Sequence, residues 1–148
     1  MKQKHRPENY LTTDIIYRHD PTPGIVLITR RNPPYGIAIP GGFLEEDVTL
    51  AENAMKELRE ETGIDALINK KDFFDVYDAL QRDPRGRMVS HVYAIHGNAE
   101  PRAGDDAATA KVYSLSEIIS SLEKNKFAFD HEKILCDYLK EKGYLKQM

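Results

Sequence analysis

The chain has 148 residues, of which 41% are hydrophobic and 30% charged, and its formal net charge is −3. This length suits a single domain with one core over residues 1–148. The acidic balance argues against a dedicated binder of nucleic acid or of an anionic membrane surface, and with Cys136 as the only cysteine there is no disulfide framework and no thiolate zinc site.

The first third of the chain predicts two strands and then a third, shorter one. Residues 10–17 alternate with β-branched side chains, and residues 24–29 form a continuous apolar run, as in a buried strand. The proline- and glycine-rich residues 20–24 between them predict a turn. The short strand ends at Ile39, and Gly41 and Gly42 then predict a tight turn before an acidic loop.

A well-delimited helix follows. Thr49 is a suitable N-cap, and Gly63 stands where a left-handed C′ glycine ends a helix. The stripe that should face the core consists of Ala51, Ala54, Met55, Leu58 and Thr62.

The second half mixes strands and helices without a regular repeat. Residues 73–80 and 88–96 predict two strands of a hairpin, and residues 111–115 predict one more after a loop. A short helix is expected over residues 116–122, and Asp130 is a plausible N-cap for a last helix. The apolar side of that helix carries Ile134, Leu135, Tyr138 and Leu139. This pattern predicts an α/β fold with a mixed sheet sandwiched between helices.

Three glutamates mark the first helix as the candidate site. Glu57, Glu60 and Glu61 follow an i, i+3, i+4 spacing, which places them on one side of the helix. Like charges this close repel, and a divalent cation would remove that cost. Hard oxygen ligands suit Mg²⁺ or Mn²⁺. The alternative is that the glutamates only form a solvated acidic face; the glycine pair and the fixed spacing argue against it.

Residues 42–64 resemble the signature of the Nudix family: glycine, five residues, glutamate, seven residues, then Arg-Glu-apolar-any-Glu-Glu-any-Gly-apolar. The register runs from Gly42 to Gly63 without an insertion, and few patterns of this length are so specific. The matching positions are Gly42, Glu57, Leu58, Glu60, Glu61, Gly63 and Ile64. The resemblance implies the Nudix fold, an α/β/α sandwich.

Two positions depart from this signature. Val48 stands where the family has its first glutamate, and Lys56 stands where it has arginine. In the family these two groups pair, so losing the carboxylate also removes the need for a forked guanidinium. We expect Lys56 to pair with Glu52 and Glu60 at helical spacing, and Val48 to pack where the ion pair was. The expected result is altered loop rigidity with metal binding kept.

The resemblance implies metal-dependent hydrolysis of the pyrophosphate bond in a nucleoside diphosphate derivative. Glu57 and Glu61 are then metal ligands, and Glu60 is a third ligand or supports the other two. A backbone carbonyl at Gly41 or Gly42 completes the coordination of Mg²⁺ or Mn²⁺.

The general base is expected from the helix or from a later loop. Asp105 and Asp106 lie in a glycine-containing loop that resembles ADP-ribose pyrophosphatases, where either could orient the water or touch a metal. A solvated acidic turn is the open alternative. The residues assigned to catalysis are Glu57, Glu60, Glu61, Asp105 and Asp106.

Three other segments, residues 32–36, 81–87 and 127–131, resemble ADP-ribose pyrophosphatases of the family. They imply hydrolysis of ADP-ribose to AMP and ribose 5-phosphate. The arginines of the middle segment are suited to bind a phosphate or a ribose, and the loop tyrosine Tyr35 is suited to stack on adenine. The alternative for each arginine is that it only forms part of a basic hairpin turn. One position counts against this subclass: Leu80 lies near a position where many ADP-sugar hydrolases carry proline. Candidate substrate-binding residues are Tyr35, Gly41, Gly42, Arg82, Arg85 and Arg87.

Two alternatives to this function stay open. One is a Nudix enzyme for another nucleotide substrate, and the other is a non-catalytic sensor that binds ADP-ribose. The resemblance also admits a homodimer, because related pyrophosphatases often build their substrate pocket across two subunits. No stretch approaches membrane-spanning length and the N-terminus has no secretory signal, so we expect a cytoplasmic protein with a small nucleotide as its partner.

Overall fold

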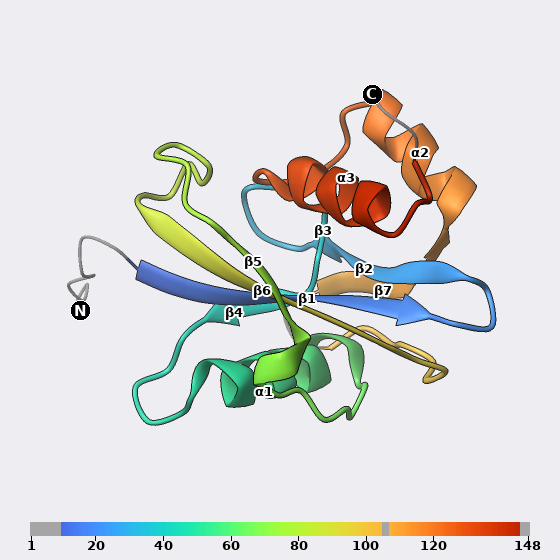
Figure 1. The fold of residues 1–148 in the computed structure, drawn as a ribbon. Helices are drawn as coiled ribbons and strands as arrows, with labels where there is room; N and C mark the ends of the chain where they lie inside the picture. Colours follow the sequence, from blue (N-terminus) through green and yellow to red (C-terminus); the bar gives the residue numbers. More distant parts are fainter. Residues whose placement is uncertain (1–9, 105–106, 146–148) are drawn as a thin grey trace.

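The computed structural model describes residues 10–104 and 107–145. A seven-stranded mixed sheet crosses the middle of the molecule (Figure 1). Its strands are β1 (Tyr10–His19), β2 (Gly24–Arg30), β3 (Ile37–Ala38), β4 (Gly41–Phe43), β5 (Phe73–Tyr77), β6 (Met88–Gly97) and β7 (Ala107–Ser114). Among these strands β1 and β6 run parallel, and the other pairs are antiparallel.

Helices cover both faces of the sheet, which confirms the predicted α/β sandwich (Figure 1). Helix α1 (Leu50–Thr62) packs on one face, where Ala54 and Leu58 meet Ile15 and Val26 of the sheet. Helices α2 (Leu115–Glu123) and α3 (His131–Glu141) pack on the other face. Four apolar residues of α3 are buried there, as predicted: Ile134, Leu135, Tyr138 and Leu139. A 3-10 turn (Lys70–Asp72) leads into β5.

Strands β1 and β2 separate shortly after the turn that joins them. They pair only at Arg18–Ile25 and His19–Gly24 within the described residues. Further on, β1 pairs with β4 and β2 pairs with β3, so residues 37–43 fill the opening between the two long strands. This insert is therefore part of the sheet itself, and β4 lies beside α1.

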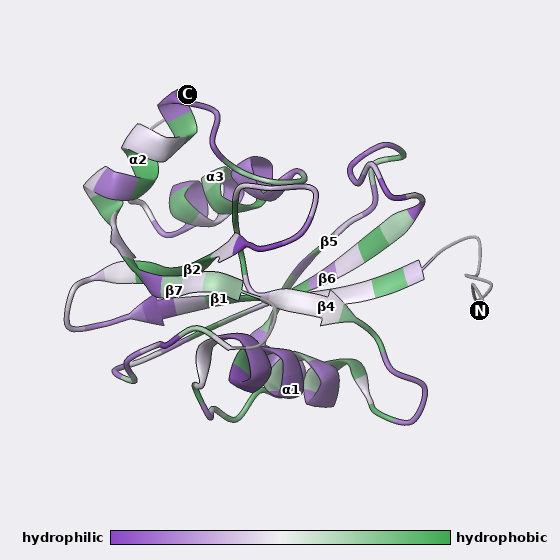
Figure 2. Ribbon diagram, turned by 180° about the vertical axis from the view of Figure 1, so that it is seen from behind, coloured by the Kyte–Doolittle hydropathy of each residue, from purple (hydrophilic) through white to green (hydrophobic). Residues whose placement is uncertain are grey.

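Helix α1 begins and ends where the sequence predicts. Thr49 accepts a hydrogen bond from the Glu52 N–H in a capping box, and Gly63 ends the helix at φ 73° in the left-handed region. Of the predicted core stripe, Ala54, Leu58 and Thr62 are buried, and Ala51 and Met55 are partly buried against the same core. Figure 2 shows hydrophilic residues along much of this helix, which carries the glutamates.

Three elements differ from the prediction in type or by more than two residues. The glycine pair at 41–42 belongs to β4 and does not form a turn, because its backbone pairs with Thr13 and Asp14 of β1. Strand β5 ends at Tyr77 and not at residue 80 as predicted, because after Tyr77 the chain turns away from β6 into the loop that carries Arg82. Strand β7 starts at Ala107, four residues before the predicted start, because β2 offers pairing partners along its whole length. No helix in the described part of the chain is both long and apolar enough to cross a membrane.

Candidate active site

A cleft of about 640 Å³ lies between β4, the acidic loop that follows it and helix α1. It brings together six of the residues predicted from the sequence: Gly41, Gly42, Glu57, Glu60, Glu61 and Arg85. Arg30, Asn32, Glu45 and Glu46 also line it. The glutamates of one helix and the glycines of one strand therefore face a common space.

The two glycines allow β4 to approach the glutamates closely. The Gly41 N–H donates a hydrogen bond of 3.0 Å to Oε1 of Glu61. A Cβ added at Gly42 would lie 2.5 Å from Oε1 of Glu57, so any larger residue there would push this carboxylate aside. The pKa of Glu57 is raised to about 7, first because the group is largely buried and then because of the charge of Glu60.

Lys56 connects the acidic loop to the helix. Its ammonium lies 2.7 Å from Glu45 and 2.8 Å from Glu60. The predicted partner Glu60 is confirmed, and the predicted partner Glu52 is wrong, because its carboxylate accepts the Thr49 N–H in the capping box. Glu45 therefore supplies the loop carboxylate that position 48 lacks.

Asn53 makes a second connection that the sequence did not reveal. The side chain is fully buried, and its amide donates to Oγ1 of Thr13 at 2.9 Å and to the Phe43 carbonyl at 3.2 Å. Its oxygen accepts the Glu45 N–H at 3.2 Å. One side chain therefore joins β1, β4 and the acidic loop to α1.

In the ranges 10–104 and 107–145, no group of three or more His, Cys, Asp or Glu side chains is arranged to hold a metal ion. Glu60 turns to Lys56 and Glu61 to the Gly41 N–H, so the carboxylates share the cleft without converging. The donor set nevertheless fits a hard divalent cation, since its ligands are oxygens. A cation beside Glu57 would also offset the burial that raises the pKa of this group.

Asp105 and Asp106 lie outside the described residues. The segment before them is attached to the last turn of α1: the Arg102 N–H donates to the Thr62 carbonyl at 2.8 Å, and the Gly104 N–H to the Glu61 carbonyl at 3.0 Å. A Cβ at Gly104 would lie 1.6 Å from the Glu60 carbonyl oxygen, so this contact requires glycine.

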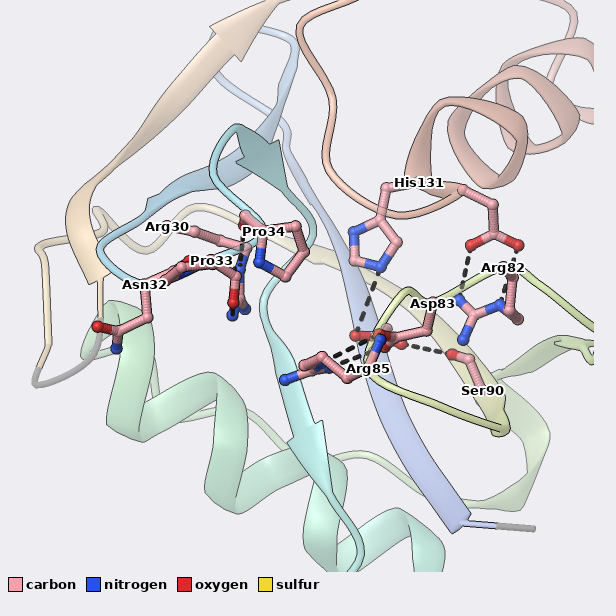
Figure 3. A network of polar contacts seen from close by, with 11 residues as sticks. Arg30, Asn32, Pro33, Pro34, Arg82, Asp83, Arg85, Ser90 and His131 are labelled. Carbon is pink, nitrogen blue, oxygen red and sulfur yellow. Dashed lines mark hydrogen bonds and ion pairs between the residues drawn. The ribbon is translucent and has the colours of Figure 1, made fainter. Parts of the chain in front are cut away.

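The other substrate-binding candidates lie in different surroundings. Arg82 is buried and makes a two-pronged pair with Asp130 at 2.9 and 2.7 Å, so the carboxylate of this N-cap residue serves the arginine and makes no cap hydrogen bond (Figure 3). Arg85 pairs with Asp83 and lies over the rings of Phe43 and Phe129 at 5.1 and 5.0 Å. Two candidates, Tyr35 and Arg87, line neither the cleft nor the pocket behind it, and Tyr35 is 68% exposed.

A smaller pocket of about 60 Å³ lies behind β4, on the face of the sheet covered by α3. Six residues line both this pocket and the cleft: Ile28, Arg30, Gly41, Gly42, Phe43 and Arg85. Its polar residues include Asp14 of β1 and His131 of α3 (His131 is labelled in Figure 3). Sequence reasoning missed both, although a carboxylate at a core position of a buried strand is itself an unusual signal.

Burial sets the protonation of both groups. The pKa of Asp14 is raised to about 6 by desolvation, which a hydrogen bond from the Ser90 hydroxyl partly offsets. The pKa of His131 is lowered to about 3, by burial and then by the charges of Arg82 and Arg30. Nδ1 of His131 accepts the Ile39 N–H at 2.9 Å. At neutral pH the floor of the pocket therefore holds a carboxylate and a neutral imidazole.

Comparisons with known proteins agree with this arrangement. The NUDIX domain model matches residues 10–138. Over 122 residues the chain is 40% identical to an ADP-ribose pyrophosphatase of Methanocaldococcus jannaschii, a match that covers 80% of this chain and 68% of that protein.

Solved structures show the same fold. A bifunctional NMN adenylyltransferase/ADP ribose pyrophosphatase from Francisella tularensis, complexed with AMP and a manganese ion, superimposes with a TM-score of 0.78 at 31% identity. That match covers 95% of this chain and 44% of the Francisella protein, so the chain spans less than half of that relative. The NUDIX domain of Shewanella oneidensis NrtR, complexed with ADP ribose, superimposes with a TM-score of 0.78 at 21% identity over 92% of this chain and 90% of its own. The chain therefore belongs to the Nudix family of pyrophosphohydrolases, as its residues 42–64 predict.

Proposed function

We propose that this protein is a divalent-metal-dependent pyrophosphatase that hydrolyses ADP-ribose to AMP and ribose 5-phosphate. The observation that carries the proposal is the shared cleft, in which Glu57, Glu60 and Glu61 face the glycine backbone of β4. The similarity to the archaeal ADP-ribose pyrophosphatase supports the choice of substrate.

Glu57, Glu61 and a carbonyl of Gly41 or Gly42 would hold the metal, with Glu60 as a third ligand or a supporting charge. A bound Mg²⁺ or Mn²⁺ supplies charge neutralisation at the pyrophosphate and a water of lowered pKa. Lys56 holds Glu60 in place, and Asn53 and Glu45 fix the loop against the helix.

Arg85 is the substrate-facing arginine of this proposal. It lines both the cleft and the pocket behind it, with its guanidinium stacked on two rings. A planar cation in that position suits a phosphate or ribose oxygen of a bound nucleotide. The proton acceptor for the attacking water is a helix glutamate or one of Asp105 and Asp106.

A panel of nucleoside diphosphate derivatives, with Mg²⁺ or Mn²⁺ and product identification by mass spectrometry, tests the proposal. We expect AMP and ribose 5-phosphate from ADP-ribose, lost in Glu61→Gln and in excess chelator. Glu123→Gln, an exposed change at the end of α2, is the matched control and should keep full activity. Unchanged AMP release in Glu61→Gln would remove the glutamates from the mechanism, and a preference for another nucleotide would replace the substrate.

A further inference from the structure

Two polar atoms face each other at the floor of the small pocket. Oδ1 of Asp14 and Nε2 of His131 are 3.9 Å apart, and the two residues are only 6% and 3% exposed. This separation is too long for a hydrogen bond between them. In the described part of the chain, neither atom has another hydrogen-bond partner.

The surrounding contacts fix which atom donates and which accepts. The Ile39 N–H occupies the lone pair on Nδ1 of His131, so the ring carries its hydrogen on Nε2. The Ser90 hydroxyl donates to Oδ2 of Asp14, which leaves Oδ1 as the free acceptor. The pocket floor therefore presents one donor beside one acceptor, both buried and both held by other hydrogen bonds.

The walls of the pocket suit a flat ring. Ile28, Ala38 and Ile39 are apolar and buried, and Phe129 lies at the same pocket. A volume of about 60 Å³ admits one edge of a ring, not a whole nucleoside. Charged residues also line the pocket, but Arg82 pairs with Asp130, Arg85 pairs with Asp83, and Arg30 donates to the Pro34 carbonyl. A partly apolar slot that ends in the donor of His131 and the acceptor of Asp14 is suited to the polar edge of a nucleobase.

The pocket and the cleft meet at β4. The Gly41 N–H binds Glu61, whereas a Cβ on the same residue would lie 2.0 Å from Oδ1 of Asp14. Because both cavities are lined by Gly41 and Gly42, one ligand can place its base at Asp14 and its diphosphate at the glutamates.

We propose that Asp14 and His131 read the edge of an aminopurine. The exocyclic amino group donates to Oδ1 of Asp14, and the adjacent ring nitrogen accepts from Nε2–H of His131. This inference rests on the proposed function, because the diphosphate in the cleft fixes the orientation of the base. Hypoxanthine in the same orientation would place its keto oxygen at the carboxylate and its ring N–H at the imidazole N–H, so both contacts would be repulsive.

The first test uses the unmodified protein. We expect kcat/KM for ADP-ribose to exceed that for inosine 5′-diphosphoribose by about 10- to 100-fold, since one well-formed base-edge contact is worth that much. AMP should also bind more tightly than IMP in calorimetry without metal. Equal use of the two substrates together with equal binding of the two nucleotides would overturn the inference and leave the proposed function standing. Tighter binding of AMP than of IMP by a protein that hydrolyses neither substrate would support the inference and overturn the proposed function.

Two variants then assign the contacts. Asp14→Asn keeps the shape but offers an amide donor, so it should reduce the preference for ADP-ribose at least about tenfold. His131→Asn keeps an acceptor for the Ile39 N–H, but its shorter side chain places no donor at the position of Nε2, so it should weaken AMP binding and leave IMP binding no weaker than before. An equal loss for adenine and hypoxanthine nucleotides in folded variants would show that the pair holds water or a ribose, and would overturn the inference.

Discussion

The ammonium of Lys56 lies 2.7 Å from the carboxylate of Glu45, so an ion pair joins the acidic loop to helix α1. Exposed pairs of this kind add less than about 1 kcal/mol to stability. We therefore expect Glu45→Gln to leave the urea midpoint almost unchanged while it lowers kcat several-fold, because the loop then holds the cleft less firmly. Asp47→Asn, an exposed change in the same loop, is the control. Equal kcat losses in the two variants would mean that loop charge matters and the pair does not.

Asn53 should matter far more to stability than to the chemical step. Asn53→Ala leaves the Thr13 hydroxyl, the Phe43 carbonyl and the Glu45 N–H without their partner. Unmade buried hydrogen bonds predict a loss of about 2–3 kcal/mol in the free energy of unfolding. Arg59→Ala, on the exposed side of the same helix, should change it by less than about 0.5 kcal/mol. Urea denaturation of both variants makes the comparison, and similar losses would contradict the assigned role.

Replacing each of the two glycines of β4 should have a different effect, on activity in one case and on stability in the other. At Gly42 a Cβ would meet only the end of the Glu57 side chain, so Gly42→Ala should fold normally and lose activity, by about 100-fold or more. At Gly41 a Cβ would lie 2.3 Å from the Thr13 carbonyl oxygen, which is backbone, so Gly41→Ala should melt at a lower temperature. Thermal melting and initial rates on both proteins test this. A Gly42→Ala protein with full activity would show that the position of Glu57 is not critical.

His131 should make the protein sensitive to acid. Its pKa is lowered to about 3 in the fold against 6.5 in the unfolded chain, so the folded state favours the neutral ring. The stability due to neutral burial is therefore complete above pH 6.5 and is lost as the pH falls toward 3. At pH 5 the loss is about 2 kcal/mol. Asp14 acts in the opposite direction: its pKa is raised to about 6, so its contribution to stability increases as the pH falls from 6 to 4.

Comparison with His131→Asn isolates the histidine, because Asp14 and the nearby charges of Arg30, Arg82, Asp83 and Arg85 are common to both proteins. The stability difference between the two proteins should narrow by about 2 kcal/mol from pH 7.5 to pH 5 in urea denaturation. A difference that stays constant over this range would mean that His131 titrates normally.

Local signals in the sequence predicted the elements that local chemistry determines. Thr49 and Gly63 delimit α1 because a cap and a left-handed glycine act within one turn of the helix. The spacing of the glutamates likewise follows from one helix. The same spacing predicted Glu60 as a partner of Lys56, but it could not predict Glu45, which lies in the acidic loop. It also suggested Glu52, whose carboxylate is occupied by the capping box.

Long-range pairing determined what sequence reasoning missed. Gly41 and Gly42 form a strand only because β1 and β2 separate and leave β1 to pair with them. Asp14 and His131 are far apart in the chain and meet only when α3 packs over the sheet. The polar character of Asp14 in an apolar strand was visible, but its partner was not.

The proposed function requires Glu57 and Glu61 to bind a divalent cation at the glycine backbone of β4. Titration with Mn²⁺ in the presence of AMP, followed by electron paramagnetic resonance, measures this directly. We expect saturable Mn²⁺ binding to the unmodified protein that is largely lost in Glu57→Gln and in Glu61→Gln, with Glu123→Gln unchanged. Equal Mn²⁺ binding by all four proteins, or none by any, would contradict it.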